Sequence, residues 1–300
     1  MGLTRESLWN KSKVFLERAL SRRDAGEFEE FQLWAVMTLE VLGKAALAHV
    51  HPALVADPQD FESLLAACGA GKSPEFRTIQ AKTVFSRCKR LVKGFDETCE
   101  RFCLQMANDR NAELHSGAVP FTSVALDTWQ PKLWHCVQLL TEAQGETLET
   151  LLGSDEAENA ASIIDDASQA LAAAVRGRIE RARSEFSVGR SVEERKHVAA
   201  AAKIAVQAQV GDSSTDVTCP ACQCVGILSG DQIDEEFIDR DEDEPWLRWV
   251  KQTYAAERFR CVACKLHLEG EQELEVAEIS TEFEKEKLQE AYDDDDYGND

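Results

Sequence analysis

Two closely spaced cysteine pairs are the strongest chemical signal in this 300-residue sequence. They are Cys219 with Cys222 and Cys261 with Cys264, and two residues separate the cysteines of each pair. Such a pair can occupy a tight turn whose backbone amides point at the sulfurs. Four thiolates form the closed tetrahedral ligand set that suits a structural zinc ion. We therefore expect one zinc ion here, with reduced, free thiols as the alternative.

The segment that carries these cysteines, residues 213–278, resembles a zinc ribbon, in which two hairpin turns hold one metal ion between them. An unusually long acidic insert separates its two halves. Cys224 and His267 are near enough in sequence to act as substitute ligands, but neither fits the paired spacing. A closed four-thiolate site has no position for water or substrate. The ribbon should therefore stabilise the fold or contact a protein, and its acidity makes direct nucleic-acid readout the weaker alternative.

A second chemical signal lies in residues 108–117, which read NDRNAELHSG near the end of an expected helix. His115 could take the proton from an RNA 2′-hydroxyl or protonate the 5′-leaving oxygen. Arg110 offers a planar fork that could hold the scissile phosphate. Asn111 could orient His115 or the phosphate, and Glu113 is a weaker candidate for polarising His115. The alternative is a pair of cations stabilised by the dipole at a helix C-terminus.

Residues 1–152 are expected to supply the helices that position this motif, because apolar residues recur there at helical spacing. Thr4 should cap the first helix, and a long second helix should run from Glu27 to Val50. The later helices are expected at about 61–68, 82–92 and 96–114, and in a final segment that Asp127 caps and Gly153 ends.

The rest of the chain should divide into three parts. Residues 153–212 are interpreted as a helical connector, most simply a solvated spacer, with a capping box at Ser191 and Glu194. Residues 213–278 form the zinc ribbon, and residues 279–300 an acidic, disordered tail. The predicted fold class is therefore mainly α: a helical bundle, a helical connector, a small C-terminal β zinc ribbon and the tail.

In this helical context, Arg110, Asn111 and His115 resemble the hallmark of the HEPN family, which is Arg, often followed by Asn, then His near a helix end. The apolar second helix, interrupted by Glu40 and Lys44, is similar to that family as well. The resemblance covers residues 5–152. It implies an HEPN-like helical bundle and a homodimeric, metal-independent endoribonuclease, often found in toxin or antiviral defence systems. Arg110 and His115 would be its catalytic pair, assisted by Asn111.

The same resemblance implies an alternative function, because many HEPN proteins have lost catalysis and only bind. The chain would then be a dimeric interaction protein that recruits a partner through its helical domain, zinc ribbon or acidic tail. If the chain does cleave RNA, a basic cluster before the motif could guide the substrate: Lys82, Lys89, Arg90 and Lys93. Such clusters are more often plain solvated helix surface.

The chain's net charge of −22 is unevenly distributed. Residues 213–300 hold 8 Lys and Arg against 25 Asp and Glu, which gives −17 for that segment. This acidity argues against sequence-blind coating of DNA, yet it leaves room for a local basic site in the first half. The sequence has no run of 18 apolar residues and no apolar leader, so we expect a cytoplasmic protein without a membrane segment.

Overall fold

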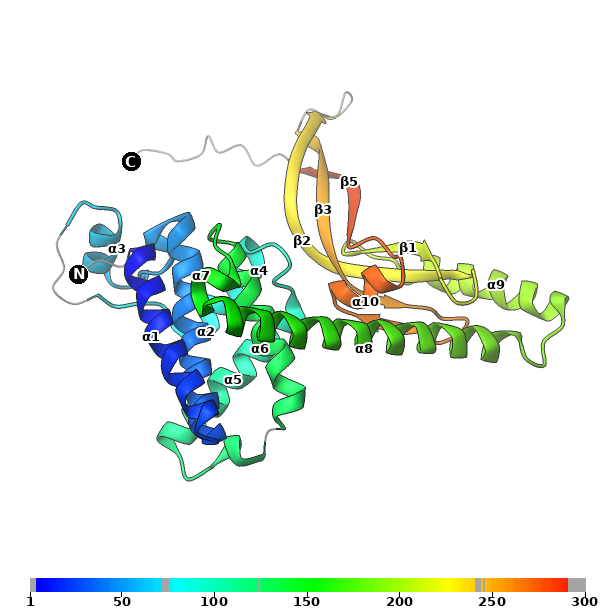
Figure 1. Ribbon diagram of the computed structural model, residues 1–300. Coiled ribbons are helices and arrows are strands. Elements are labelled where there is room, and N and C mark those ends of the chain that lie inside the picture. Colours follow the sequence, from blue (N-terminus) through cyan, green and yellow to red (C-terminus); the bar gives the residue numbers. More distant parts are fainter. Residues whose placement is uncertain (1–3, 72–75, 124, 241–243, 245, 291–300) are drawn as a thin grey trace. The chain divides into compact units, whose positions relative to one another are not determined.

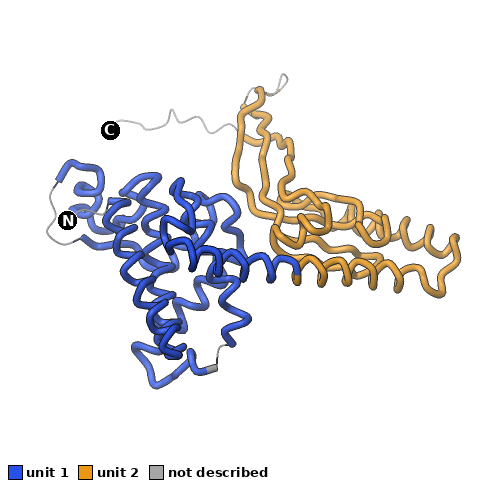
Figure 2. Tube along the Cα trace, viewed as in Figure 1, with its two compact units in different colours: residues 1–169 blue, residues 170–300 orange. Residues whose placement is uncertain are grey.

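The structure is a computed structural model, and it describes residues 4–71, 76–123, 125–240, 244 and 246–290. It comprises two compact units, the helical unit of residues 1–169 and the sheet unit of residues 170–300 (Figure 2). Helices account for 59% of the chain and strands for 18%, the strands forming one five-stranded antiparallel sheet in the C-terminal half. The prediction of a mainly α fold is therefore wrong: the chain is mixed α/β, though largely helical.

The helical unit packs its helices around one apolar core (Figure 1). Its elements are α1 (Arg5–Asp24), α2 (Phe28–Val50), η1 (Pro52–Leu54), α3 (Phe61–Ala67), α4 (Ala81–Leu91), α5 (Glu97–His115), η2 (Pro120–Ser123), α6 (Leu126–Glu142), α7 (Leu148–Leu152) and the first part of α8 (Ser154–Ser187). The helices up to α5 lie close to the predicted ranges, since their apolar stripes must be buried. The final segment, expected as one helix ending at Gly153, is instead two helices, α6 and α7, separated by residues 143–147.

Helix α2 forms the centre of this core. Phe31, Ala35, Leu39 and Leu42 recur at helical spacing, and each is at most 1% exposed. Among the described residues, α2 is the one helix long and apolar enough to cross a membrane, but 61% of its most apolar window is buried inside the protein. Because it packs against α1, α4, α5 and α6, α2 is a core helix of the helical unit.

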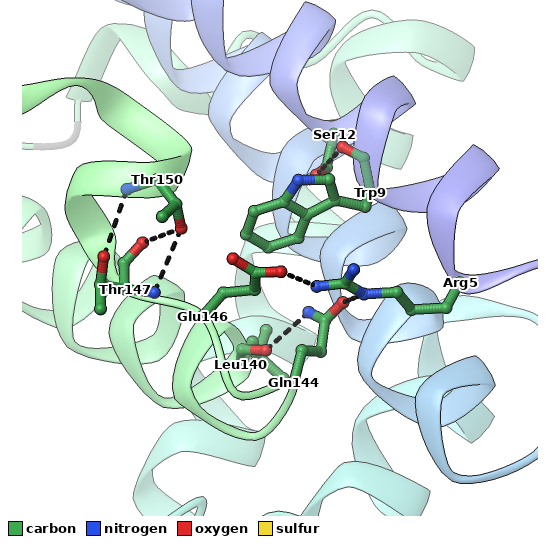
Figure 3. A network of polar contacts seen from close by, with 8 residues as sticks. All are labelled: Arg5, Trp9, Ser12, Leu140, Gln144, Glu146, Thr147 and Thr150. Atoms are coloured by element: carbon green, nitrogen blue, oxygen red, sulfur yellow. Dashed lines mark hydrogen bonds and ion pairs between the residues drawn. The ribbon is translucent and has the colours of Figure 1, made fainter.

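A polar network fixes the start of α1 to the connection between α6 and α7 (Figure 3). The guanidinium of Arg5 contacts the Glu146 carboxylate at 2.6 Å and donates to Oε1 of Gln144 at 3.2 Å. The Gln144 amide in turn donates to the Leu140 carbonyl at 2.8 Å. These bonds join segments about 140 residues apart, so the helical unit closes on itself.

The first residues of the helices can be compared with the predicted N-caps. Thr4 accepts a hydrogen bond from the Ser7 amide, and Ser191 forms a capping box with Glu194, so both predictions are confirmed. The prediction for Asp127 is wrong: α6 begins at Leu126, with Ala125 at the capping position. Asp127 still lies in the first turn, where its charge complements the helix dipole.

The sheet unit combines the second part of α8 with a sheet and two further helices (Figure 1). The strands follow the order β1-β2-β3-β4, and β5 also pairs with β3. Its other elements are α9 (Val192–Gln207), β1 (Ser214–Thr218), β2 (Val225–Arg240), β3 (Leu247–Arg260), β4 (His267–Glu269), α10 (Glu271–Val276) and β5 (Glu282–Glu290).

The acidic insert and part of the predicted tail are strands, which is why the mainly α prediction failed. Residues of the insert extend β2 and β3 into one long antiparallel hairpin, whose register shifts near Ile233 and Ile238. Residues 282–290, predicted to be disordered, form β5 along β3, and the rings of Tyr254 and Phe283 stack with centroids 5.0 Å apart. The aspartate run at 293–296 lies outside the described residues.

The prediction that residues 153–212 form a solvated spacer is also wrong for the part that belongs to the sheet unit, from residue 170 onward. Val175, Ile179, Ala182 and Phe186 form one stripe of α8 and are buried in the apolar core of the sheet unit. Residues of α9 pack against the same core. The border between the two units thus lies within α8, at residues 169 and 170.

Candidate metal centre and arginine–histidine site

Each cysteine pair occupies a tight turn of the same construction. In the first turn, the amide of Cys219 donates to the carbonyl of Cys224 at 2.8 Å, and the amide of Gln223 donates to the carbonyl of Cys219 at 3.0 Å. The second turn has the same two hydrogen bonds. The amide of Cys261 donates to the carbonyl of Leu266 at 2.8 Å, and the amide of Lys265 donates to the carbonyl of Cys261 at 3.0 Å. Gln223 and Lys265 have φ values of 60° and 65°, the left-handed conformation that lets each turn close.

The two turns bring their four sulfurs together. The Sγ atoms of Cys219 and Cys264 are 3.6 Å apart, and those of Cys222 and Cys261 are 3.5 Å apart. All four lie within 4.8 Å of one another. Sulfurs at about 2.3 Å from a tetrahedral zinc ion would be about 3.8 Å apart, so this spacing fits a metal. The predicted cluster is confirmed as a group that could hold a metal ion.

The two substitute ligands stay outside this cluster. The thiol of Cys224 donates to the carbonyl of Cys222, 3.8 Å away. The exposed imidazole of His267 lies 2.9 Å from the carboxylate of Glu269, which is also on strand β4. The paired spacing therefore identified the four cysteines that lie together.

Helix α8 holds the first turn from outside. The guanidinium of Arg183 donates to the carbonyls of Pro220 at 3.0 Å and Ala221 at 3.2 Å, the two residues between the cysteines of that turn. One turn along the helix, Phe186 is buried in the same core as Cys219. The metal centre and α8 therefore share one packed core.

The cysteines of the helical unit are mostly core residues. Cys88, Cys99, Cys103 and Cys136 are buried in the helical unit, whereas Cys68 is exposed. Burial raises the pKa of Cys88 to about 12, which keeps it a neutral thiol at neutral pH.

The second site begins with Arg110, whose side chain is only 16% exposed. Its guanidinium contacts the Glu40 carboxylate on α2 at 2.9 Å and donates through Nε to Oδ1 of Asn111 at 3.0 Å. Glu40 also pairs with Lys44 at 2.8 Å, and Lys44 donates to Thr78 at 3.2 Å. Glu40 and Lys44 stand out in the sequence as charges within an apolar helix, but their spacing gives no sign of the contact with Arg110.

His115 is the last residue of α5 and is exposed. Within the part of the chain that the structure describes, its side chain makes no hydrogen bond or ion pair. Arg110 and His115 are five residues apart, which on a helix means roughly 140° of rotation and 7.5 Å of rise. Asn111 contacts Arg110 and not His115, and one carboxylate oxygen of Glu113 is buried without a partner among the described residues. A single chain thus holds Arg110 in place and leaves His115 open to solvent.

The predicted RNA-guiding residues lie on and just after α4. Lys82, Arg90 and Lys93 are exposed and Lys89 is half-buried, while Val84 and Phe85 are buried on the inward side. The helix follows Thr78, the partner of Lys44, by three residues. This places the start of the basic cluster beside the Glu40 network.

The Glu40 network should add pH-dependent stability. Burial alone would raise the pKa of Glu40, but Lys44 and Arg110 outweigh it, and the net shift lowers the pKa below 4.5. Because the pKa of Glu40 is lower in the folded state, its ionised carboxylate stabilises the protein above pH 4.5. This contribution to stability is lost as the pH falls through the folded-state pKa. Glu40→Gln should therefore reduce the free energy of unfolding at pH 7 by about 1–3 kcal/mol.

Chemical denaturation of both proteins between pH 7 and pH 3 measures this effect. The difference between wild type and Glu40→Gln should shrink below pH 4.5. Glu17→Gln, an exposed glutamate on α1, is the matched control and should change stability little at any pH. A difference that stays constant down to pH 3 would contradict the assigned role of Glu40.

Comparisons of the chain with models of protein families, with curated proteins and with solved structures find no significant match. The HEPN assignment therefore stays a prediction that rests on the residues of this chain.

Proposed function

We propose that this protein is a metal-independent endoribonuclease of the HEPN type. The observation that carries the proposal is the contact network that holds Arg110: Glu40 and Asn111 orient its guanidinium on the helix that ends at exposed His115. A preoriented fork can bind a phosphate with little loss of side-chain entropy. Basic residues on neighbouring α4 favour an RNA substrate.

In this mechanism His115 transfers protons and Arg110 binds the phosphate. The RNA 2′-hydroxyl attacks the adjacent phosphorus while an imidazole removes its proton, and the bond to the 5′-oxygen breaks as that oxygen is protonated. Arg110 stabilises the charge that develops on the phosphoryl oxygens. The products are a 2′,3′-cyclic phosphate and a 5′-hydroxyl.

We further propose a homodimer, because His115 and Arg110 make no contact within one described chain. Two chains related by a two-fold axis would bring two histidines and two arginines to one groove, which supplies both a base and an acid. The proposed setting is a cytoplasmic toxin or defence system, as the HEPN resemblance implies.

We propose zinc as the metal of the four-cysteine cluster, with a structural role. Four thiolates suit zinc, and they leave no coordination position for water or substrate. The acidic sheet unit around them is poorly suited to binding phosphates. The nuclease site of the helical unit should thus work without the metal.

The test is an RNA cleavage assay with purified protein in the presence of EDTA. Cleavage should persist during brief chelation, because the reaction depends on His115 and Arg110. Mass spectrometry of the products should find 2′,3′-cyclic phosphate ends. Activity that strictly requires Mg²⁺, or products with 3′-hydroxyl ends, would exclude this mechanism.

One observation favours the alternative, a non-catalytic interaction protein. The strand registers place five carboxylates of β2 and β5 on the face of the sheet that carries Trp249 and Lys251: Asp234, Glu236, Asp239, Glu284 and Glu286. Trp249 is 38% exposed. This face suits a protein partner rich in Lys and Arg. A protein that leaves RNA intact yet binds such a partner would support the alternative.

A further inference from the structure

A groove of about 400 Å³ lies on the helical unit between α5, η2 and α6. This volume is within the range of small-molecule sites, roughly 300–1,000 Å³. The groove is lined by Phe102, Gln105, Met106, Asp109, Pro120, Thr128, Trp129 and Lys132. Half-buried Phe102 provides apolar surface for a flat ring, whereas Met106 and Trp129 are buried, at 4% and 3% exposed. Asp109 and Lys132 bring opposite charges to the same groove.

The groove lies one helical turn from the Glu40–Arg110 pair. Met106 precedes Arg110 by four residues on α5, and it packs with Val36, which precedes Glu40 by four residues on α2. Four residues of helix span about 6 Å, close to the distance between a nucleotide's base and its phosphate. A base in the groove would therefore have its phosphate within reach of Arg110.

The groove offers one carboxylate and one ammonium group, the two kinds of charged group that the edges of guanine can bind. Gln105 donates to one carboxylate oxygen of Asp109 at 2.9 Å, and since each oxygen has two lone pairs, both oxygens can still accept from a ligand. Burial raises the pKa of Asp109, a cost that new hydrogen bonds to the carboxylate would offset. Guanine offers adjacent N–H donors on one edge and the acceptors O6 and N7 on the other, which a lysine can bind. Adenine, cytosine and uracil lack this combination.

We propose that this groove binds a guanine base, so that the enzyme cleaves RNA beside guanosine. The inference rests on the proposed function and adds a base preference to it. Asp109 accepts from N1–H and the N2 amino group, Lys132 donates to O6 or N7, and the ring lies on Phe102. Bases of single-stranded RNA are commonly recognised by such a combination of stacking and hydrogen bonds to their edges.

The test measures binding of the four nucleoside 3′-monophosphates to the full chain by calorimetry, which needs no RNA cleavage. The guanosine nucleotide should bind at least about tenfold more tightly than the other three. Asp109→Asn should remove this preference, because the amide cannot accept two hydrogen bonds from the base. Lys132→Gln should weaken guanosine binding about tenfold. Glu100→Gln, on the opposite side of α5, is the matched control and should bind like wild type.

Equal affinities for the four nucleotides, or an unchanged guanosine preference in Asp109→Asn, would overturn the assignment. Sequencing the ends of cleaved RNA separates this proposal from the proposed function. Cleavage without guanosine preference would contradict the proposed base site but not the nuclease proposal. Selective guanosine binding by a protein that cuts no RNA would contradict the nuclease proposal and support the base site.

Discussion

Cys219→Ser is expected to abolish metal binding and unfold the sheet unit. Serine does not replace a thiolate in a four-sulfur site, and the binding free energy of a structural zinc ion is folding free energy on the order of 10 kcal/mol. The loss should spread beyond the ribbon, because Arg183 and Phe186 of α8 pack on the same turn and core. The helical unit has a separate apolar core and should keep its own unfolding transition.

Metal analysis and hydrogen exchange measure this result. Wild type should contain about one metal ion per chain, and Cys219→Ser close to none, with rapid exchange in β1–β5 and in the second part of α8. Cys224→Ser is the matched control, since this neighbouring buried cysteine lies outside the cluster. A Cys219→Ser protein that exchanges as slowly as wild type would refute a structural role for the metal.

His115→Ala is expected to reduce RNA cleavage by about 10²–10⁴-fold, the usual contribution of one acid–base group. His115 is exposed at the end of α5, so its removal should leave the stability of the helical unit unchanged. Arg110→Lys should also reduce cleavage strongly, since a lysine keeps the charge paired with Glu40 but lacks the fork for phosphate.

Initial rates on a labelled RNA, together with thermal unfolding of each variant, provide the measurement. His49→Ala is the matched control because His49 is exposed in the last turn of α2. It should cleave like wild type. If His115→Ala retains full activity, the motif is a helix-end cation pair and the nuclease assignment fails.

Much of the helical unit could be predicted because its signals are local. The apolar spacing of α2 and the side-chain cap at Thr4 each depend on residues within a few positions of one another, and so does the capping box at Ser191 in the sheet unit. The cysteine cluster could also be predicted from the sequence, since each pair forms a turn of its own and four thiolates suit one shared metal ion.

The extended sheet was missed because its stability comes from distant partners. Residues 282–290 carry alternating charges and look solvated, yet they become β5 once β3 provides a ladder and Tyr254 a ring for Phe283. Long-range pairing of this kind leaves little trace in composition. The contact of Glu40 with Arg110 spans 70 positions, although two charges in an apolar helix did mark that helix as unusual.

The metal centre also depends on the hairpin that follows its first turn. Cys222 and Cys261 are 39 positions apart, and closing an open loop of that length would cost roughly 3 kcal/mol in chain entropy. The ladder between β2 and β3 already brings the two turns together, with Ile227 paired to Arg260. Ladder formation and metal binding therefore close the same loop, so each stabilises the other. Weakening the ladder far from any sulfur should consequently raise the dissociation constant of the metal.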